Sequence, residues 1–285
     1  MDKLIVPCSY QGGKQRLAKQ IVDIILTNKD INKNTKFYDL CCGSGAISLE
    51  LINRGINPKY IIMVDKSPWG VFWEKIGNGT FDINLFENYI NDIPKDITKI
   101  KDYAKNMLKE PSNNILLDDM VYKFLILQSC AFGGTATWIE NNKWKKAGGL
   151  RNYWLPTEKS NRKSPVNPMM PMPNSLFNRV KMISNKAYGV TGKYCDVEDI
   201  DIEKNSIVYI DPPYKGTQDY GFNFNYDKFI DRYKGFTDIY ISEGFSMNNS
   251  NEHILLSQGR SKGNINGNLK KKPTEEWLNV FYKNN

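Results

Sequence analysis

The chain has 285 residues, of which 39 are Lys or Arg and 31 are Asp or Glu, so its formal net charge is +8. Hydrophobic residues make up 40% of it, and we therefore expect a packed core rather than a disordered chain. The apolar runs are too short to span a bilayer, and none follows the N-terminal charges as in a signal peptide. These features argue against membrane and secreted proteins and favour a cytoplasmic protein with a polyanionic partner.

The histidine and cysteine content argues against further classes of reaction and of binding site. The single histidine, His253, argues against Ser-His-Asp hydrolysis and against metal sites built from several histidines. Five cysteines occur, two of them adjacent as Cys41-Cys42, and no Cys-x-x-Cys pair is present. This pattern indicates neither a disulfide framework nor a zinc ribbon, so we expect reduced thiols and no bound metal.

Strand-like and helix-like segments alternate along much of the chain. A helix over residues 15–27 precedes a short strand at 36–40, a glycine-rich segment at 41–45 and an apolar helix at 46–53. A strand at 60–64 ends at Asp65, a strand at 206–210 ends at Asp211, and a further strand is expected at 236–242. The alternation predicts an α/β fold with a doubly wound, parallel sheet.

The middle of the chain has a different pattern. Residues 84–130 indicate helices, and the aromatic residues and glycines between 132 and 154 favour a β-hairpin that turns at Asn141-Asn142. Residues 164–173 are too rich in proline for a central strand or a helix. We therefore expect one domain over residues 1–80 and 190–285, interrupted by an inserted helical and β-hairpin subdomain over residues 81–189.

The tetrapeptide Asp211-Pro212-Pro213-Tyr214 follows a strand, at the position where α/β sheets bind ligands. Its prolines stiffen the loop and leave carbonyl oxygens and the Asp211 carboxylate as hydrogen-bond acceptors. Acceptors beside an aromatic ring suit a planar aromatic amine, because the acceptors bind its N–H groups and the ring stacks on its face. The alternative is a strand-ending turn with a surface tyrosine.

A second candidate site follows the strand at 36–40. The glycines of the segment 41–45 let the backbone approach a ligand closely, and a helix N-terminus comes next, although the Gly-x-Gly-x-x-Gly dinucleotide pattern is absent. Asp65 ends the next strand, where an acidic side chain can accept hydrogen bonds from ribose hydroxyls. The alternative for Asp65 is a helix N-cap. Asp39, the loop and Asp65 together favour a nucleoside cofactor.

In this order, these segments resemble the Dam-like (D12 class) DNA adenine-N6 methyltransferases, which include phage-encoded members. The resemblance covers residues 1–80 and 190–245, whereas the middle matches only in kind, as a target-recognition insert. Residues 241–245 match only loosely, and residues 272–277 depart from the family's pattern. The resemblance implies a Rossmann-like methyltransferase sheet, S-adenosyl-L-methionine as cofactor and double-stranded DNA as substrate. The matching pieces are Ser9-Tyr-Gln-Gly-Gly-Lys14, residues 37–45, Asp65, Tyr194-Cys-Asp196 and Asp211-Pro-Pro-Tyr214.

The resemblance also implies roles for single residues. Lys14 would face the methionine carboxylate of the cofactor, Asp65 would hold its ribose and Asp196 would bind its adenine amine. The implied catalytic residues are Asp211, Pro212, Pro213 and Tyr214: the Asp211 carboxylate and the Pro212 carbonyl accept the two N6 hydrogens of a flipped adenine, and Tyr214 stacks on it. The implied cofactor-binding residues are Tyr10, Gly12, Gly13, Lys14, Asp39, Gly43, Ser44, Gly45, Asp65 and Asp196.

Basic and aromatic residues alternate in the expected hairpin, a pattern that suits phosphate contacts and base-edge readout. The alternative is a solvated hairpin over a small tryptophan core. The glycine-rich basic stretch 258–272 is either a phosphate-contacting loop or a tail. The candidate DNA-binding residues are Lys143, Trp144, Lys145, Lys146, Arg151, Asn152 and Tyr153.

Several alternatives stay open at this point. The same acceptors suit N4 of cytosine as well as N6 of adenine, and a catalytically silent protein that binds DNA or cofactor and blocks nucleases has the same motifs. Pro7-Cys8 is similar to the nucleophile dipeptide of cytosine-C5 methyltransferases, but it precedes the glycine-rich loop instead of following it. The enzyme is either solitary or paired with a separate cognate endonuclease, and the abundance of Asn, Lys and Ile suggests an AT-rich genome, as in a phage.

Overall fold

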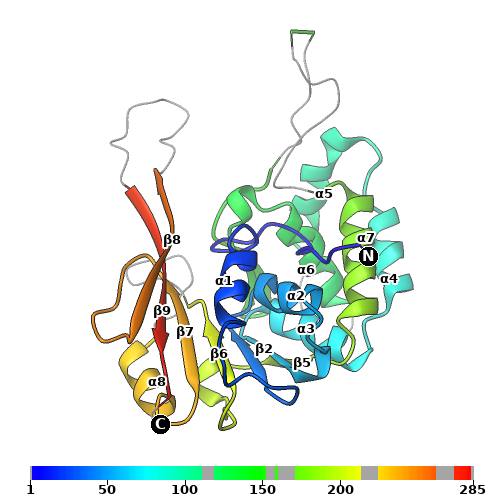
Figure 1. The fold of residues 1–285 in the computed structure, drawn as a ribbon. Coiled ribbons are helices and arrows are strands. Elements are labelled where there is room, and N and C mark those ends of the chain that lie inside the picture. The colour runs from blue at the N-terminus through cyan, green and yellow to red at the C-terminus, as the bar shows by residue number, and fades with distance from the viewer. Residues whose placement is uncertain are drawn as a thin grey trace.

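A computed structural model describes residues 2–110, 119–151, 158–159, 171–212, 224–260 and 273–283 of the chain. At its centre is a seven-stranded sheet with the strand order β5-β2-β1-β6-β7-β9-β8 (Figure 1). The strands are β1 (Phe37–Leu40), β2 (Ile61–Asp65), β5 (Thr191–Tyr194), β6 (Ile207–Ile210), β7 (Asp238–Glu243), β8 (Glu252–Arg260) and β9 (Pro273–Phe281).

The first five strands of this order are parallel to one another. β9 lies between β7 and β8 and pairs antiparallel with both. Every residue of β1, β2, β6 and β7 is buried, as expected for strands that are covered on both faces. The expected α/β fold with a mostly parallel sheet is thus confirmed, and the carboxyl ends of β1, β2 and β6 lie side by side at one edge.

Helices cover both faces of the sheet. Phe37, Met63 and Tyr209 pack in a core shared with the first three helices, whereas Leu40, Val64 and Ile210 pack in a second core with α8. Because successive strand residues point to opposite faces, β1, β2 and β6 each contribute to both cores. The helices are α1 (Ala18–Ile25), α2 (Ala46–Asn53), α3 (Pro68–Asn78), α4 (Ile83–Asn91), α5 (Ile100–Met107), α6 (Met120–Ser129), α7 (Pro173–Lys186) and α8 (Tyr226–Tyr233), with short 3-10 helices η1 (Pro58–Tyr60), η2 (Ile97–Lys99), η3 (Phe132–Gly134) and η4 (Val197–Asp199).

The middle of the chain forms a helical group beside α3. Helices α4 to α7 gather at the end of the molecule opposite β8 and β9 (Figure 1). The hairpin of β3 (Thr137–Glu140) and β4 (Lys143–Lys146) turns at Asn141 and Asn142, whose φ angles of 51° and 57° match the left-handed turn that Asn favours. The expected hairpin and its turn are confirmed, whereas the boundaries 81–189 of an inserted subdomain stay a prediction.

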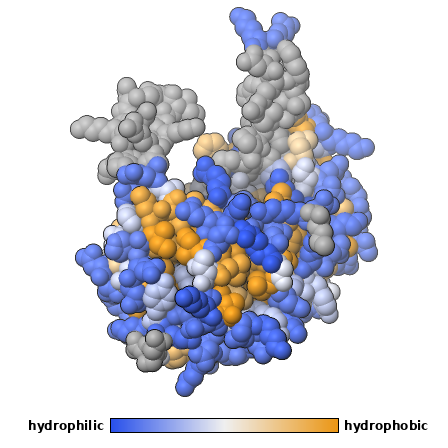
Figure 2. All heavy atoms as spheres, in the orientation of Figure 1, coloured by the Kyte–Doolittle hydropathy of each residue, from blue (hydrophilic) through white to orange (hydrophobic). Residues whose placement is uncertain are grey.

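Most of the face shown in Figure 2 is hydrophilic, and hydrophobic side chains gather in its middle, over the β7–β9 part of the sheet and beside α1. Among the described residues, no helix has the length and apolar character needed to cross a membrane.

Candidate functional site

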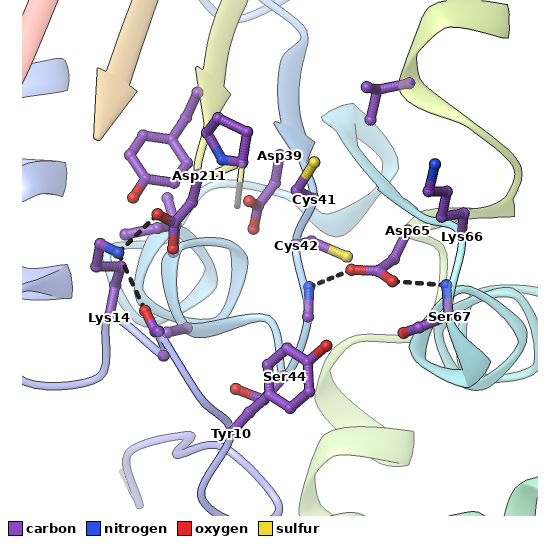
Figure 3. Close-up of a pocket in the computed structure, with 18 of the residues that line it drawn as sticks. Tyr10, Lys14, Asp39, Cys41, Cys42, Ser44, Asp65, Lys66, Ser67 and Asp211 are labelled. Carbon is purple, nitrogen blue, oxygen red and sulfur yellow. Dashed lines mark hydrogen bonds and ion pairs between the residues drawn. The ribbon is translucent and has the colours of Figure 1, made fainter. Parts of the chain in front are cut away.

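A pocket of about 290 Å³ opens at the carboxyl ends of β1, β2 and β6 (Figure 3). It brings together segments that are far apart in the sequence, among them the residues that follow β1, β2 and β6, as the topology of a parallel sheet predicts. Its lining includes Tyr10, Gly12, Gly13, Lys14, Asp39, Gly43, Ser44, Asp65, Asp196, Asp211 and Pro212, all of them residues that the sequence singles out.

The glycine-rich loop after β1 is fixed by close packing. Gly43 has a φ of 48°, and a Cβ there would lie 2.8 Å from the ring of Tyr10. Gly45 has a φ of 78°, and a Cβ there would lie 2.2 Å from the ring of Trp73. The indole N–H of Trp73 also donates to the carbonyl of Gly43 over 2.9 Å. The loop therefore requires glycine at both positions and presents a rigid backbone to the pocket.

Asp65 organises this loop from the end of β2. One of its carboxylate oxygens accepts the N–H of Gly43 and the other accepts the N–H of Ser67, each over 2.8 Å (Figure 3). The N-cap of α3 is Ser67, whose hydroxyl accepts the N–H of Trp69, so Asp65 is not the cap itself. Burial raises the pKa of Asp65, while the hydrogen bonds from Ser67 and Gly43 act against that rise. Each oxygen keeps a lone pair with which a ligand hydroxyl can bond.

Asp39 lies below the loop and is almost fully buried. Its Oδ2 accepts the backbone N–H of Ser48 over 3.1 Å and the Ser48 hydroxyl over 2.6 Å, which ties β1 to the first turn of α2. Burial raises the pKa of Asp39 to about 7, because the surrounding core disfavours a charge more than the two bonds stabilise it.

Asp196 lies at the rim of the pocket, just after β5. Its Oδ2 pairs with the ammonium of Lys66 over 2.6 Å, and its Oδ1 accepts the N–H of Glu198 over 3.1 Å. Partial burial acts to raise the pKa of Asp196, but the bond and charge of Lys66 and the bonds from backbone N–H groups together outweigh it, and the net shift of the pKa is downward. The Asp196 carboxylate is thus charged and lies beside the residues that follow Asp65.

Lys14 and Asp211 form the centre of the pocket. The Lys14 ammonium lies 2.6 Å from Oδ1 of Asp211 and donates to the carbonyl of Gly12 over 3.0 Å (Figure 3). Burial raises the pKa of Asp211 to about 6 against the opposing charge of Lys14, so the carboxylate is ionised at neutral pH. Lys14, which the resemblance assigns to the cofactor carboxylate, here contacts the strand-end acid instead.

Sequence reasoning missed two acidic residues near this centre. Glu276 on β9 places Oε1 3.4 Å from the Lys14 ammonium, and Glu243 ends β7, where it accepts the hydroxyl of Tyr226. Glu243 follows an apolar strand in the same way as Asp211 does, and that signal could have identified it. For Glu276 there was no such signal, because its position depends on the antiparallel placement of β9.

The candidate DNA-binding residues are only partly brought together. Lys143, Lys145 and Lys146 are exposed on β4, and Trp144 between them is buried, so the strand presents its lysines to solvent. Arg151 is buried, and its Nε donates to the carbonyl of Ala131 over 2.6 Å, so it does not share their exposed surface. The remaining candidates lie outside the described residues, as do two catalytic ones: Asn152, Tyr153, Pro213 and Tyr214.

Cys8 does not have the character of a nucleophile. It is buried, and its burial raises the pKa of the thiol to about 12, which leaves almost no thiolate at neutral pH. The Pro7-Cys8 dipeptide therefore does not support cytosine-C5 chemistry.

Comparison with known proteins agrees with this geometry. The model of the D12 class N6 adenine-specific DNA methyltransferase family matches residues 10–277. Among curated proteins, none matches the chain significantly.

Proposed function

The chain belongs to the D12 class N6 adenine-specific DNA methyltransferases, and from this premise we propose that it transfers a methyl group from S-adenosyl-L-methionine to the N6 amine of an adenine flipped out of double-stranded DNA. Membership in the family makes it an adenine-N6 DNA methyltransferase. The cofactor, the flipped base, the residues that act and specificity for one DNA site are the proposed parts.

One observation carries the proposal: Asp65 and Asp211 line the same pocket, at the carboxyl ends of the parallel strands β2 and β6, which lie on either side of β1. Asp65 has free lone pairs for ribose hydroxyls, and the tight packing of Gly43 leaves bare backbone beside it. Asp211 lies across the pocket with an ionised carboxylate. One end of the pocket suits a nucleoside and the other end suits an amine. The pocket therefore fits a cofactor and a target base that lie next to each other.

The residues of the pocket fit S-adenosyl-L-methionine in chemical terms. Asp65 would hold the ribose, Asp196 the adenine amine, and the backbone of residues 43–45 would cover the cofactor's middle. When bound, the cofactor supplies a methyl group on a positively charged sulfur, which is already activated for transfer.

The chain's own part in the reaction is to hold the target amine. An exocyclic amine is a weak nucleophile because its lone pair is delocalised into the ring. The Asp211 carboxylate and the Pro212 carbonyl would accept hydrogen bonds from its two N–H groups, which favours a pyramidal nitrogen and stabilises the positive charge that develops on it. As the N–CH3 bond forms and the methyl–sulfur bond breaks, with the demethylated cofactor as the leaving group, the nitrogen would release one of its two protons. Alignment of the amine with the methyl supplies much of the remaining rate enhancement. Tyr214 would stack on the base.

Exposed lysines on β4 are proposed to contact phosphates, because three exposed cations on one strand of a hairpin suit a DNA backbone. A separate cognate endonuclease and a phage origin stay predictions.

The test is a transfer assay with labelled S-adenosyl-L-methionine and unmethylated duplex DNA, followed by digestion and mass spectrometry of the nucleosides. We expect N6-methyladenine from the wild type and from Asp201→Asn, whose side chain is fully exposed, but none from Asp211→Asn. N4-methylcytosine would select the alternative amine. Cofactor binding without any product would favour a catalytically silent protein that binds DNA or cofactor.

A further inference from the structure

The Lys14 ammonium is shared between two carboxylates that come from different strands. Asp211 follows β6, and Glu276 lies on β9, which runs antiparallel to the strands beside it. All three side chains are largely buried, at 6% exposure for Lys14 and 16% for each carboxylate. Two carboxylates and one ammonium leave the group with one net negative charge.

A neutral pair of Lys14 and Asp211 would be a poor acceptor for a developing positive charge. An ammonium 2.6 Å away opposes any cation that approaches the same carboxylate. Glu276, 3.4 Å from that ammonium, offsets part of its charge and offers it a second carboxylate. The Asp211 carboxylate thereby keeps more of its negative character while Lys14 still holds it in place.

We propose that Glu276 is a positioning residue of the methyl-transfer site: it shares the Lys14 ammonium with Asp211 and so preserves the Asp211 carboxylate as an acceptor for the target amine. This inference rests on the proposed function for its chemistry. The coupling between the three side chains can be measured separately, without methyl transfer.

The local backbone supports a specific placement of Glu276. The register of β8 and β9 shifts between Leu255 and Ser257, where these two residues face Trp277 and Glu276. A bulge of this kind increases the local twist and re-aims side chains, and bulges occur often beside active sites. The adjacent Glu275 instead accepts bonds from Gln258 and Trp277. Two neighbouring glutamates thus have different partners, and only Glu276 contacts Lys14.

The charges around Asp211 set the direction of the expected effect. Burial raises its pKa to about 6, Lys14 lowers it, and Glu276 and Glu243 raise it. Loss of the Glu276 charge removes one of the effects that raise the pKa of Asp211. Asp211 then no longer shares the Lys14 ammonium with a second carboxylate, so its pKa falls. The titratable groups that bear on Asp211 are Lys14, Glu276, Glu243, Asp39, Tyr209, Tyr226 and Cys41.

The first experiment titrates the Asp211 carboxyl carbon by NMR, with its signal assigned from Asp211→Asn. In Glu276→Gln, we expect its midpoint to fall by about one pH unit from the wild-type value, whereas Glu276→Asp, which keeps the charge, stays near it. Glu275→Gln is the matched control, and thermal unfolding verifies that each variant is folded. An unchanged midpoint in Glu276→Gln, or an equal fall in Glu275→Gln, overturns the inference.

The second experiment measures single-turnover methyl transfer against pH. We expect the acid limb of Glu276→Gln to move down with the carboxyl midpoint and its plateau rate to fall about tenfold, one factor of ten for each 1.36 kcal/mol, with the KM for DNA unchanged. A plateau and acid limb equal to the wild type overturn the inference. If the wild type forms no N6-methyladenine while the NMR midpoint still moves, the proposed function fails and the coupling of Glu276 to Asp211 is supported.

Discussion

Replacing Asp65 by Asn removes one of the two acceptor oxygens through which Asp65 joins the glycine-rich loop to the start of α3. The Asp65 carboxylate accepts the N–H groups of Gly43 and Ser67, both over 2.8 Å. An Asn side chain has one acceptor oxygen and one donor NH2 group, so one of these two backbone donors would face another donor. Leaving a buried donor without a partner costs about 1 to 3 kcal/mol.

This cost sets the size of the expected effect. If the loop moves away to relieve the conflict, cofactor binding must restore it, and 1 to 3 kcal/mol corresponds to a roughly 5- to 150-fold weaker affinity. Calorimetric titration with S-adenosyl-L-methionine measures this change. If the loop holds its conformation, the cost appears as a lower free energy of unfolding, which denaturant titration measures.

Asp82→Asn is the matched control for Asp65→Asn. Asp82 also accepts two backbone N–H groups, at the start of α4, but it is exposed and does not line the pocket. Asn is as good an N-cap as Asp, so this variant should keep both affinity and stability. Asp65→Asn with wild-type affinity and wild-type stability would refute the role given to Asp65.

Three further outcomes follow from the site. In the wild type, the rate of methyl transfer should fall as pH drops through about 6, because protonation of Asp211 removes an acceptor; Asp211→Asn should lack transfer at every pH while still binding cofactor. Burial raises the pKa of Asp39 to about 7, so the wild type loses stability as the pH rises and this carboxyl ionises. The free energy of unfolding of Asp39→Asn minus that of the wild type should therefore rise between pH 4 and 8, and denaturant titration at each pH measures this difference. The triple replacement of Lys143, Lys145 and Lys146 by Ala should weaken DNA binding and reduce the salt slope of log K by about 2 to 3, as measured by fluorescence anisotropy.

Each of these three has a result that contradicts it. An acid limb unrelated to pH 6 would show that Asp211 does not limit transfer. A constant stability difference across that pH range would show that Asp39 does not titrate with a raised pKa. The control for the lysine variant replaces three other exposed lysines, which precede strands and so lie at the sheet edge opposite the pocket: Lys29, Lys33 and Lys59. An equal loss of DNA affinity in this control would show a general charge effect.

The aspartates at the ends of strands could be predicted from the sequence, whereas the residues that surround them could not. Apolar runs that stop at an aspartate place Asp65 and Asp211 at the same sheet edge once the strands are parallel, and a glycine-rich turn between strand and helix needs no distant partner. β5 was not recognised as a strand, because its four residues include a glycine and a lysine and are mostly exposed.

Tertiary contacts decided the remaining differences. Glu276 reaches Lys14 only because β9 pairs antiparallel with β7, and no periodicity in residues 272–277 indicates that pairing. Arg151 suggested a phosphate contact by its charge and its neighbours, yet its Nε bonds to the carbonyl of Ala131 in the interior. Whether a basic side chain faces solvent depends on a partner twenty residues away, which local composition does not show.

The position of β9 has a consequence for heat inactivation. β8 and β9 form one margin of the sheet, and among the described strands β8 has a neighbour on one side only. Marginal strands open at a lower free energy than central ones. Fraying of this margin would separate Glu276 from the pocket while the parallel strands stay folded, so catalysis should decline on warming before circular dichroism registers any melting.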